Sequence, residues 1–388
     1  MTPPDAAGSD PDRLARVALG RLAEPGDPRL ASLVADLGAA EVADHLRSER
    51  DASGLATDVA SRLQGLDPAG ELDRAARQGI RFVCPGDDEW PRRLADLDHA
   101  AQLNRRGGAP LGLWVRGPGR LDELLARSVS VVGSRSATTY GAAVAGEIAA
   151  HLAGEGVTVV SGAAYGIDQA AHRGALAARG PTVAVLACGV DRAYPAAHRD
   201  LLDYIAGTGV VVSEVPPGCA PTRLRFLARN RLIAAASLGT VVVEAAVRSG
   251  ALNTANWASL VNRPVMGVPG PVTSAPSEGV HELIRTRDAT LVTRGSDVLE
   301  LVSPAGSHTL APRRAPERAH DRLSDTDRQV LDGVPVASPA STASVARTAG
   351  VGLRSTTEAL ARLRAAGFVG SSEAGWRLRP RTDPTEAP

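Results

Sequence analysis

Short apolar runs alternate with helix-like segments between Ser128 and about Leu301. Continuous Val-rich runs of this kind are typical of parallel strands that are covered on both faces, with helices as crossovers. We therefore predict an α/β fold built on a parallel sheet. The predicted strands are residues 129–132, 157–160, 182–187, 209–213, 240–243 and 264–268, and helical patterns lie between them at 142–152, 170–178 and 223–236.

The region before this sheet has a different periodicity. From Pro11 to Gln78, apolar positions recur at helical spacing in short stretches that Gly or Pro interrupts, which predicts a small helical domain over residues 11–79. A short strand at 80–83 and an apolar run at 111–115 follow, so we place the α/β domain at 80–302. Residues 1–10 are acidic and rich in Pro and Gly, and we expect them to be disordered.

The region after the sheet begins with a segment that is rich in Pro, Ala and Arg and has no periodicity. We interpret residues 303–320 as a linker. Three helical patterns at 323–331, 343–349 and 355–366, followed by a predicted β-hairpin, are typical of a winged helix over residues 321–380. We expect the tail at 381–388 to be disordered.

Composition limits the classes of partner. The chain has 43 basic and 43 acidic residues, and every basic residue is Arg. With a formal net charge of zero, a nucleic-acid site must be a local groove rather than a positive coat. Cys84, Cys188 and Cys219 lack the spacing of a zinc site or a disulfide scaffold, and we expect Cys188 to be buried. We expect no metal, cofactor or membrane contact, and a cytoplasmic location.

The segment 223–231 concentrates the cations. It contains four Arg residues, one Asn and one of only three Phe residues in the chain. Guanidiniums that hold phosphates, beside a ring that stacks on a base, are the ingredients of single-strand nucleic-acid binding. An amphipathic helix with a solvated basic face is the alternative. The residues with candidate chemistry are Arg223, Arg225, Phe226, Arg229, Asn230 and Arg231.

Three predicted strands end in Ser and Gly residues, at Gly133-Ser134-Arg135, Ser161-Gly162 and Ser249-Gly250. Because ligands of open α/β sheets bind at the carboxyl edge, these loops predict phosphate sites at one edge. Ordinary strand-to-helix turns are the alternative. None of the three has the spacing of a dinucleotide fingerprint or a Walker loop. We interpret Asp168 as a helix cap rather than a catalytic group, and His172 and His198 as surface or core residues.

Together these segments closely resemble the DNA-processing protein A family (DprA, also called Smf). The resemblance covers about residues 80–301 and rests on the following stretches: Gly133-Ser134-Arg135 with Tyr140-Gly141, Ser161-Gly162 with Gly166-Ile167-Asp168, Ala171-His172-Arg173-Gly174, Phe226 with Arg229-Asn230-Arg231, Val242-Val243-Glu244-Ala245, Ser249-Gly250-Ala251-Leu252 and Val268-Pro269-Gly270.

The resemblance implies an extended Rossmann-like sheet, an N-terminal domain similar to sterile-alpha-motif (SAM) modules and a C-terminal winged helix. It also implies a homodimeric protein without enzymatic activity, which binds single-stranded DNA, helps to load RecA onto it and protects transforming DNA. The DNA contacts that it implies, with Arg225 added on chemistry alone, are Gly133, Ser134, Arg135, Ser161, Gly162, Tyr165, Gly166, Arg225, Phe226, Arg229, Asn230, Arg231, Ser249 and Gly250.

Some positions depart from the family pattern. Tyr165 stands where Arg is common, so one cation is replaced by a ring. Leu227 replaces the usual Pro after the Phe, and His281 replaces the usual Asn in the late motif that is expected to form the dimer. The dimer contacts that the resemblance implies are Val280, Leu283 and Ile284.

Two other functions compete. Ser237-Leu238-Gly239-Thr240 followed by Glu244 weakly echoes a motif of nucleoside-monophosphate phosphoribohydrolases of the lysine-decarboxylase-like group, although the Pro-Gly-Gly is missing and the Glu comes one position late. Alternatively, the winged helix reads duplex DNA as a regulator. Its expected recognition helix carries Arg362 and Arg364 at the C-terminal end, whereas base contacts usually come from the N-terminal end.

Overall fold

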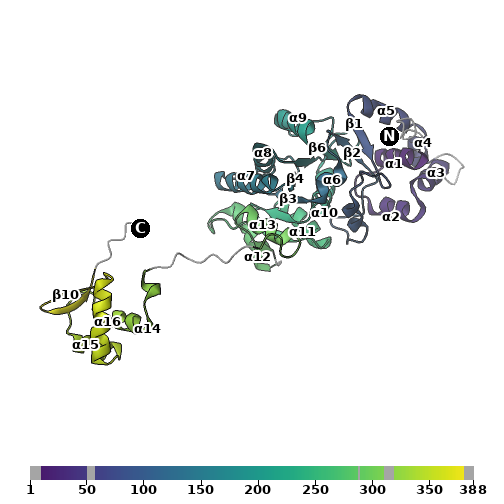
Figure 1. The fold of residues 1–388 in the computed structure, drawn as a ribbon. Coiled ribbons are helices and arrows are strands. Elements are labelled where there is room, and N and C mark those ends of the chain that lie inside the picture. Colours follow the sequence, from purple (N-terminus) through teal and green to yellow (C-terminus); the bar gives the residue numbers. More distant parts are fainter. Residues whose placement is uncertain (1–9, 50–56, 287–288, 310–318, 380–388) are drawn as a thin grey trace. The chain divides into compact units, whose positions relative to one another are not determined.

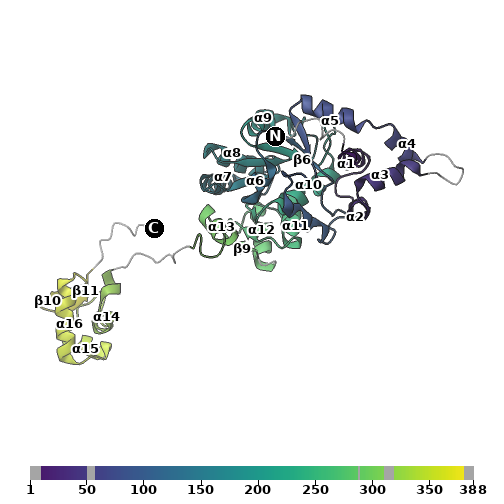
Figure 2. The same ribbon diagram turned by 45° about the vertical axis from the view of Figure 1, so that its right-hand side comes forward.

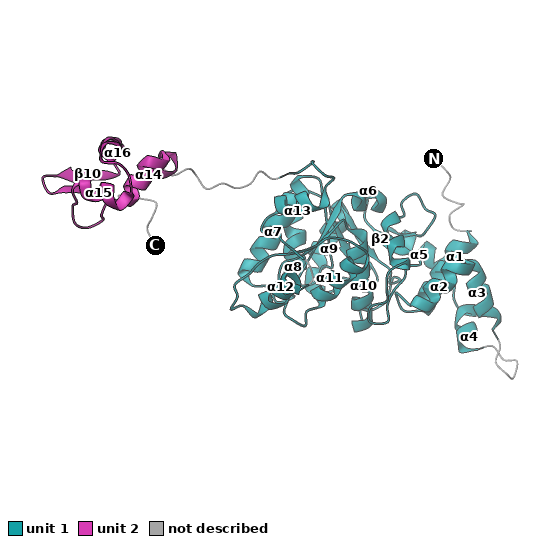
Figure 3. Ribbon diagram, turned by 90° about the horizontal axis from the view of Figure 1, so that it is seen from below, with its two compact units in different colours: residues 1–310 teal, residues 311–388 magenta. Residues whose placement is uncertain are grey.

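The computed structural model describes residues 10–49, 57–286, 289–309 and 319–379. The chain forms two compact units, residues 1–310 and 311–388 (Figure 3). The predicted disorder at 1–9 and 381–388, and half of the predicted linker, at 310–318, lie outside the described residues. No helix in the described ranges is long and apolar enough to cross a membrane.

A nine-stranded sheet forms the centre of the first unit, with the strand order β1-β2-β6-β5-β4-β3-β7-β8-β9 (Figure 1). The strands from β3 to β9 pair in parallel, while β2 pairs antiparallel with both β1 and β6, which confirms the predicted parallel α/β sheet. The strands are β1 (Ile80–Val83), β2 (Leu113–Arg116), β3 (Ser128–Val132), β4 (Thr158–Ser161), β5 (Thr182–Val185), β6 (Val210–Ser213), β7 (Thr240–Val242), β8 (Val265–Gly267) and β9 (Thr290–Leu291).

Helices cover both faces of the sheet, as the buried Val-rich strands require. Successive side chains of β3 enter opposite cores: Val131 packs with α7 and α8, and Val132 packs with α10 and α11. The helices of this region are η1 (Arg92–Asp98), α6 (Leu121–Ala126), α7 (Thr139–Gly154), α8 (Ile167–Ala177), η2 (Ala196–His198), α9 (Arg199–Thr208), α10 (Arg223–Ala236), α11 (Gly250–Leu260), α12 (Ala275–Thr286) and α13 (Gly295–Val302).

The N-terminal helices pack beside the antiparallel end of the sheet, near β1 and β2 (Figures 1 and 2). Asp10, Asp27 and Asp67 cap three of them, each followed by Pro at the start of the helix, where a missing N–H costs nothing. The helices are α1 (Pro11–Leu22), α2 (Pro28–Leu37), α3 (Ala39–Ser48), α4 (Asp58–Gln64) and α5 (Pro68–Arg77).

The second unit contains three α-helices followed by an antiparallel hairpin, the element order that the sequence predicts. Val330, Val345, Leu360 and Leu363 form its core, and an isolated bridge joins Ala340 to the hairpin. The elements are η3 (Ala319–Arg322), α14 (Asp325–Asp332), α15 (Thr342–Ala349), α16 (Leu353–Ala365), β10 (Val369–Ser372) and β11 (Gly375–Leu378).

Candidate nucleic-acid interface

A groove lies at the carboxyl edge of the sheet, where the strand order reverses. β3 has β4 on one side and β7 on the other, so the chain leaves the two sides in opposite directions and opens a crevice between the loops. The loops after β3 and β7 line it, together with the start of α10. Of the predicted residues, those that line the groove are Gly133, Ser134, Arg135, Phe226, Arg229, Asn230, Ser249 and Gly250.

Backbone contacts hold the loop after β3 in place. The Ser134 N–H donates to the carbonyl of Glu244 at 2.6 Å, and the Ser134 carbonyl accepts from the N–H of Ile167 at 3.1 Å. A Cβ at Gly133 would lie 2.6 Å from Ile167, and one at Gly166 would lie 2.3 Å from the Ser134 carbonyl oxygen. The two glycines therefore allow the loops after β3 and β4 to pack against each other.

The buried Glu244 anchors the start of α7. Its carboxylate accepts hydrogen bonds from the backbone N–H of Thr138 at 2.9 Å and from the Thr138 hydroxyl at 2.5 Å. Gly141 leaves room for this carboxylate, because a Cβ there would lie 2.3 Å from it. Glu244, the residue that the hydrolase alternative needs, is thus engaged in holding the loop.

Three exposed guanidiniums surround the groove. Arg135, Arg223 and Arg248 line it, and none of them forms an ion pair with a carboxylate of the described residues. Arg223 begins α10 and Arg248 precedes the helix cap Ser249. These side chains are available to bind an anion without first breaking an ion pair.

A fourth guanidinium, that of Arg229, lies at the buried floor of the groove. It donates to the carbonyl of Val185 at 2.9 Å, and its Nε has no partner among the described residues. Burial lowers the pKa of Arg229, while the nearby Asp168 opposes that shift. A Cβ at Gly162 would lie 1.6 Å from Nη1 of Arg229, so Gly162 makes room for this side chain.

Asp168 does not cap the helix, contrary to the sequence-based interpretation. Gly166 is the N-cap of α8, and the Asp168 carboxylate accepts instead from the backbone N–H of Ala164 at 3.3 Å. Burial raises the pKa of Asp168, and Arg229 is the largest influence in the opposite direction. Each of the two groups thus partly offsets the effect of burial on the pKa of the other.

Aromatic rings and guanidiniums meet at the middle of the groove. The guanidinium carbon of Arg135 lies over the Phe226 ring at 4.7 Å, and that of Arg229 lies 5.8 Å from the same ring. The ring of Tyr194 is 5.6 Å from Phe226 and also lines the groove. The site therefore combines cations with aromatic surface, as the composition of α10 predicts.

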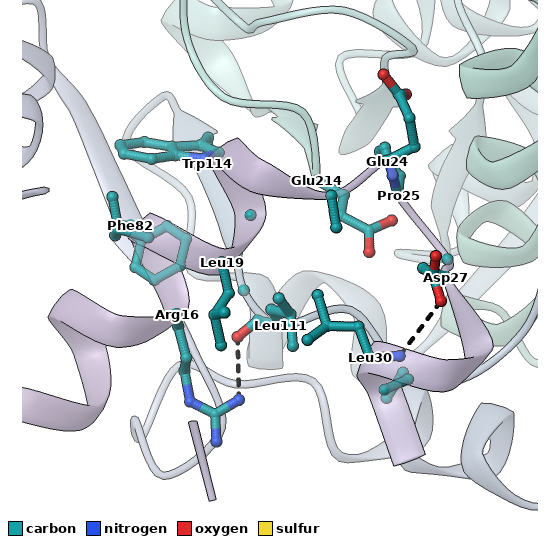
Figure 4. Close-up of a pocket in the computed structure, with 17 residues that line it drawn as sticks. Arg16, Leu19, Glu24, Pro25, Asp27, Leu30, Phe82, Leu111, Trp114 and Glu214 are labelled. Carbon is teal, nitrogen blue, oxygen red and sulfur yellow. Dashed lines mark hydrogen bonds between the residues drawn. The ribbon is translucent and has the colours of Figure 1, made fainter. Parts of the chain in front are cut away.

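Two of the predicted contacts on α10, Arg225 and Arg231, do not line the groove. Arg231 is fully buried, and its Nη2 donates to both oxygens of Glu214, at 2.7 and 2.8 Å. Arg225 pairs with Glu24 through two hydrogen bonds, at 2.8 and 2.9 Å. Figure 4 shows Glu24 and Glu214 in a crevice between the N-terminal helices and the sheet.

Four other predicted contacts are also absent from the groove lining: Ser161, Gly162, which makes room for Arg229, Tyr165 and Gly166. The buried Ser161 hydroxyl donates to the carbonyl of Val131 at 2.7 Å. Tyr165 is exposed, but its ring packs edge-on against His198, 4.7 Å away. Gly166 allows the loops after β3 and β4 to pack against each other. His172 and His198 are buried, and so is Cys188, as expected.

Asn230 links the groove to α11. Its side-chain amide donates to the carbonyl of Gly250 at 3.3 Å and to the side chain of Asn253 at 3.2 Å. Ser249 caps α11 by accepting from the backbone N–H of Ala251 at 3.3 Å. Gly250 is open, because a Cβ there would meet nothing within 4 Å.

The predicted dimer contacts are wrong for two of the three residues. Val280 and Leu283 are buried inside this chain, where they pack in the core with α11. A Cβ at Gly267 of β8 would lie 2.9 Å from both Val280 and Ile284, which shows how closely α12 covers this strand. Ile284 is only partly buried.

Sequence reasoning missed Tyr194 and left out Arg223 and Arg248 as contacts. Tyr194 follows β5, a strand that ends at the same edge as the three Ser/Gly loops, so a search of every strand end for rings would have found it. Arg223 has candidate chemistry in the sequence but was not among the predicted DNA contacts, although it lines the groove. Among the described residues, no cluster of His, Cys, Asp or Glu could hold a metal ion.

Comparison with known proteins agrees with this geometry. A family model described as DNA recombination-mediator protein A matches residues 81–303. The chain belongs to this family. Because the DprA family consists of DNA-binding recombination mediators rather than enzymes, this chain is a DNA-binding mediator and the phosphoribohydrolase alternative is set aside.

Sequence similarity to known relatives extends beyond residues 81–303. The chain is 44% identical over 371 residues, 95% of each chain, to a protein of Mycobacterium tuberculosis named as the DNA processing protein DprA. It is 43% identical over 191 residues, 49% of this chain and 66% of the relative, to the DNA processing protein DprA of Streptococcus pneumoniae. The X-ray structure of DprA from that species matches with a TM-score of 0.61 and 31% identity, over 76% of this chain and 98% of the other.

Proposed function

We propose that this DprA-family protein binds single-stranded DNA in the groove at the carboxyl edge of the sheet. The observation that carries the proposal is a set of three exposed guanidiniums, Arg135, Arg223 and Arg248, around an aromatic centre, which form no ion pair with the part of the chain that the structure describes. The guanidiniums contact phosphates as bidentate donors, and the buried Arg229 adds a fourth positive charge at the floor.

The aromatic centre favours a single strand over a duplex. A ring can stack only on a base whose face is open, and the faces of duplex bases are covered by their neighbours. Cations alone would bind either form, because phosphate contacts carry no base information. Stacking is therefore what makes the groove selective for single strands.

We further propose that the bound strand is passed to RecA and that the protein acts as a homodimer, as the family resemblance implies. Of the three predicted dimer contacts, only Ile284 is partly exposed, whereas Val280 and Leu283 are buried within this chain. The rate at which RecA assembles on single-stranded DNA, with and without this protein, tests the first proposal. Sedimentation of the full chain tests the second.

The binding test replaces Arg135, Arg223 and Arg248 with Gln in one variant. Loss of three phosphate contacts should weaken binding to a single-stranded oligonucleotide and flatten the plot of log K against log salt by about 2, since each contact contributes roughly 0.7. Arg173→Gln, an exposed change on α8 outside the groove, should alter neither quantity. An unchanged slope in the triple variant, or tighter binding of wild type to duplex, would contradict the proposal.

A further inference from the structure

Tyr194 is a second aromatic ring in the groove. Among the described residues, no Arg side chain stacks on it. It lies between β5 and η2, the residue is 43% exposed, and it lines the groove. The ring of Phe226, 5.6 Å away and tilted by 53°, is its aromatic neighbour.

Phe226 and Tyr194 differ in what covers them. Arg135 lies over the ring of Phe226 at 4.7 Å and Arg229 is 5.8 Å from it, so Phe226 is half-buried among cations. Such cation–π contacts orient a guanidinium while its donors stay free for phosphate. No cation lies over Tyr194 among the described residues, so its ring face is the one that is more open to a ligand.

The loop that carries Tyr194 is tied to the segment before α10. The Asp191 carboxylate accepts from the backbone N–H of Gly218, with its two oxygens at 2.9 and 3.0 Å. The Gly189 N–H donates to the carbonyl of Cys219 at 3.0 Å. These bonds tie the loop before Tyr194 to the segment before α10, and such ordering reduces the entropy that a stacked base would cost.

We propose that Tyr194 is a base-stacking residue of this groove, and the inference rests on the proposed single-strand function. A base on Tyr194 extends the path of the strand from the loops after β3 and β7 to the end of β5. Phe226 then acts mainly by orienting Arg135 and Arg229, while Tyr194 supplies the open face. The subsite accepts any nucleobase, because every base has a π-face.

The test compares Tyr194→Leu with Tyr194→Phe on two oligonucleotides of equal length, one with bases and one with abasic sugars throughout. Loss of one stacked base should weaken binding of the Leu variant to the normal strand about 5- to 150-fold, with an unchanged salt slope. Binding to the abasic strand should not change. Tyr194→Phe keeps the ring and should bind the normal strand as wild type does.

Tyr204→Leu is the matched control, because Tyr204 is an exposed ring on α9 that does not line the groove. It should leave binding unchanged, and thermal unfolding of each variant verifies that it folds. If Tyr194→Leu weakens both strands equally, or neither, the stacking role is overturned while single-strand binding stands. If wild type does not bind the normal strand at all, the proposed function itself fails.

Discussion

Arginines of the same helix have opposite surroundings in this protein. On α10, Arg223 and Arg229 line the groove, whereas Arg225 and Arg231 pair with Glu24 and Glu214 outside it. The residues of α10 that line the groove are at positions 223, 226, 227, 229, 230 and 233, which share one face of the helix, and positions 225 and 231 fall outside the two edges of that face. The difference is one of position and partner, because the residue type is the same.

The comparison separates two uses of a guanidinium. Arg231 is 0% exposed, and a Cβ at Gly26, between α1 and α2, would lie 2.8 Å from its Nε, so its charge is committed within the fold. A buried charge that keeps its partner is tolerated, and one that loses it is costly. Arg135, in contrast, is exposed and free to change partners. The density of cations in a segment therefore does not measure its affinity for phosphate.

The largest effect is expected from Arg231→Met. Removing the guanidinium leaves Glu214 buried without its partner, which should lower the free energy of unfolding of the first unit by about 3–5 kcal/mol. Denaturant unfolding measures this loss. The control is Arg135→Met, the same change in the groove, which should alter stability by no more than about 0.5 kcal/mol but weaken binding to single-stranded DNA. If the Arg231→Met variant is as stable as wild type and its binding to single-stranded DNA depends less steeply on salt, Arg231 contacts DNA after all.

The sequence was sufficient to predict the sheet and its edge. Val-rich runs identified the parallel strands, and the Ser/Gly loops after β3 and β7 were correctly expected at one edge. It could not separate Arg229 from Arg231, because their partners, Val185 and Glu214, come from distant segments. Burial of Val280 and Leu283 escaped prediction for the same reason. Their apolar character fits a core and an interface equally well.

A smaller effect is expected from Gly162→Ala, which tests the floor of the groove. The new Cβ would lie 1.6 Å from Nη1 of Arg229, so the guanidinium must move away from the carbonyl of Val185. Overpacking of this kind costs about 1–3 kcal/mol of stability, and affinity for single-stranded DNA should fall with it. The matched control is Gly250→Ala, where the Cβ meets nothing within 4 Å and stability should be unchanged. Equal unfolding midpoints for the two variants would show that Gly162 does not position Arg229.

Gly162 and Gly250 show that two similar short motifs can have different structural roles. Ser161-Gly162 and Ser249-Gly250 look alike in the sequence, and both follow strands at the same edge. In the structure, the Ser161 hydroxyl is bonded to the carbonyl of Val131 and Gly162 accommodates a neighbour, whereas Ser249 caps a helix that opens onto the groove. The chemistry of a short motif depends on which side chain of another element lies against it.

The smallest effect, and the sharpest test of the comparison, is expected from Glu24→Gln. The Arg225–Glu24 pair is partly exposed, so its loss should change the free energy of unfolding by less than about 1 kcal/mol. Hydrogen bonding to Glu24 raises the pKa of Arg225, and without that carboxylate the guanidinium is free to reach a phosphate. Affinity for single-stranded DNA at low salt should rise, with a salt slope steeper by up to about 0.7. Arg225→Gln in the wild-type background should leave the slope unchanged, because the ion pair already holds this side chain away from the strand. A flatter slope for Arg225→Gln would show that Arg225 binds phosphate despite its pairing with Glu24. Arg225 would then belong with the DNA-binding arginines and not with the structural ones.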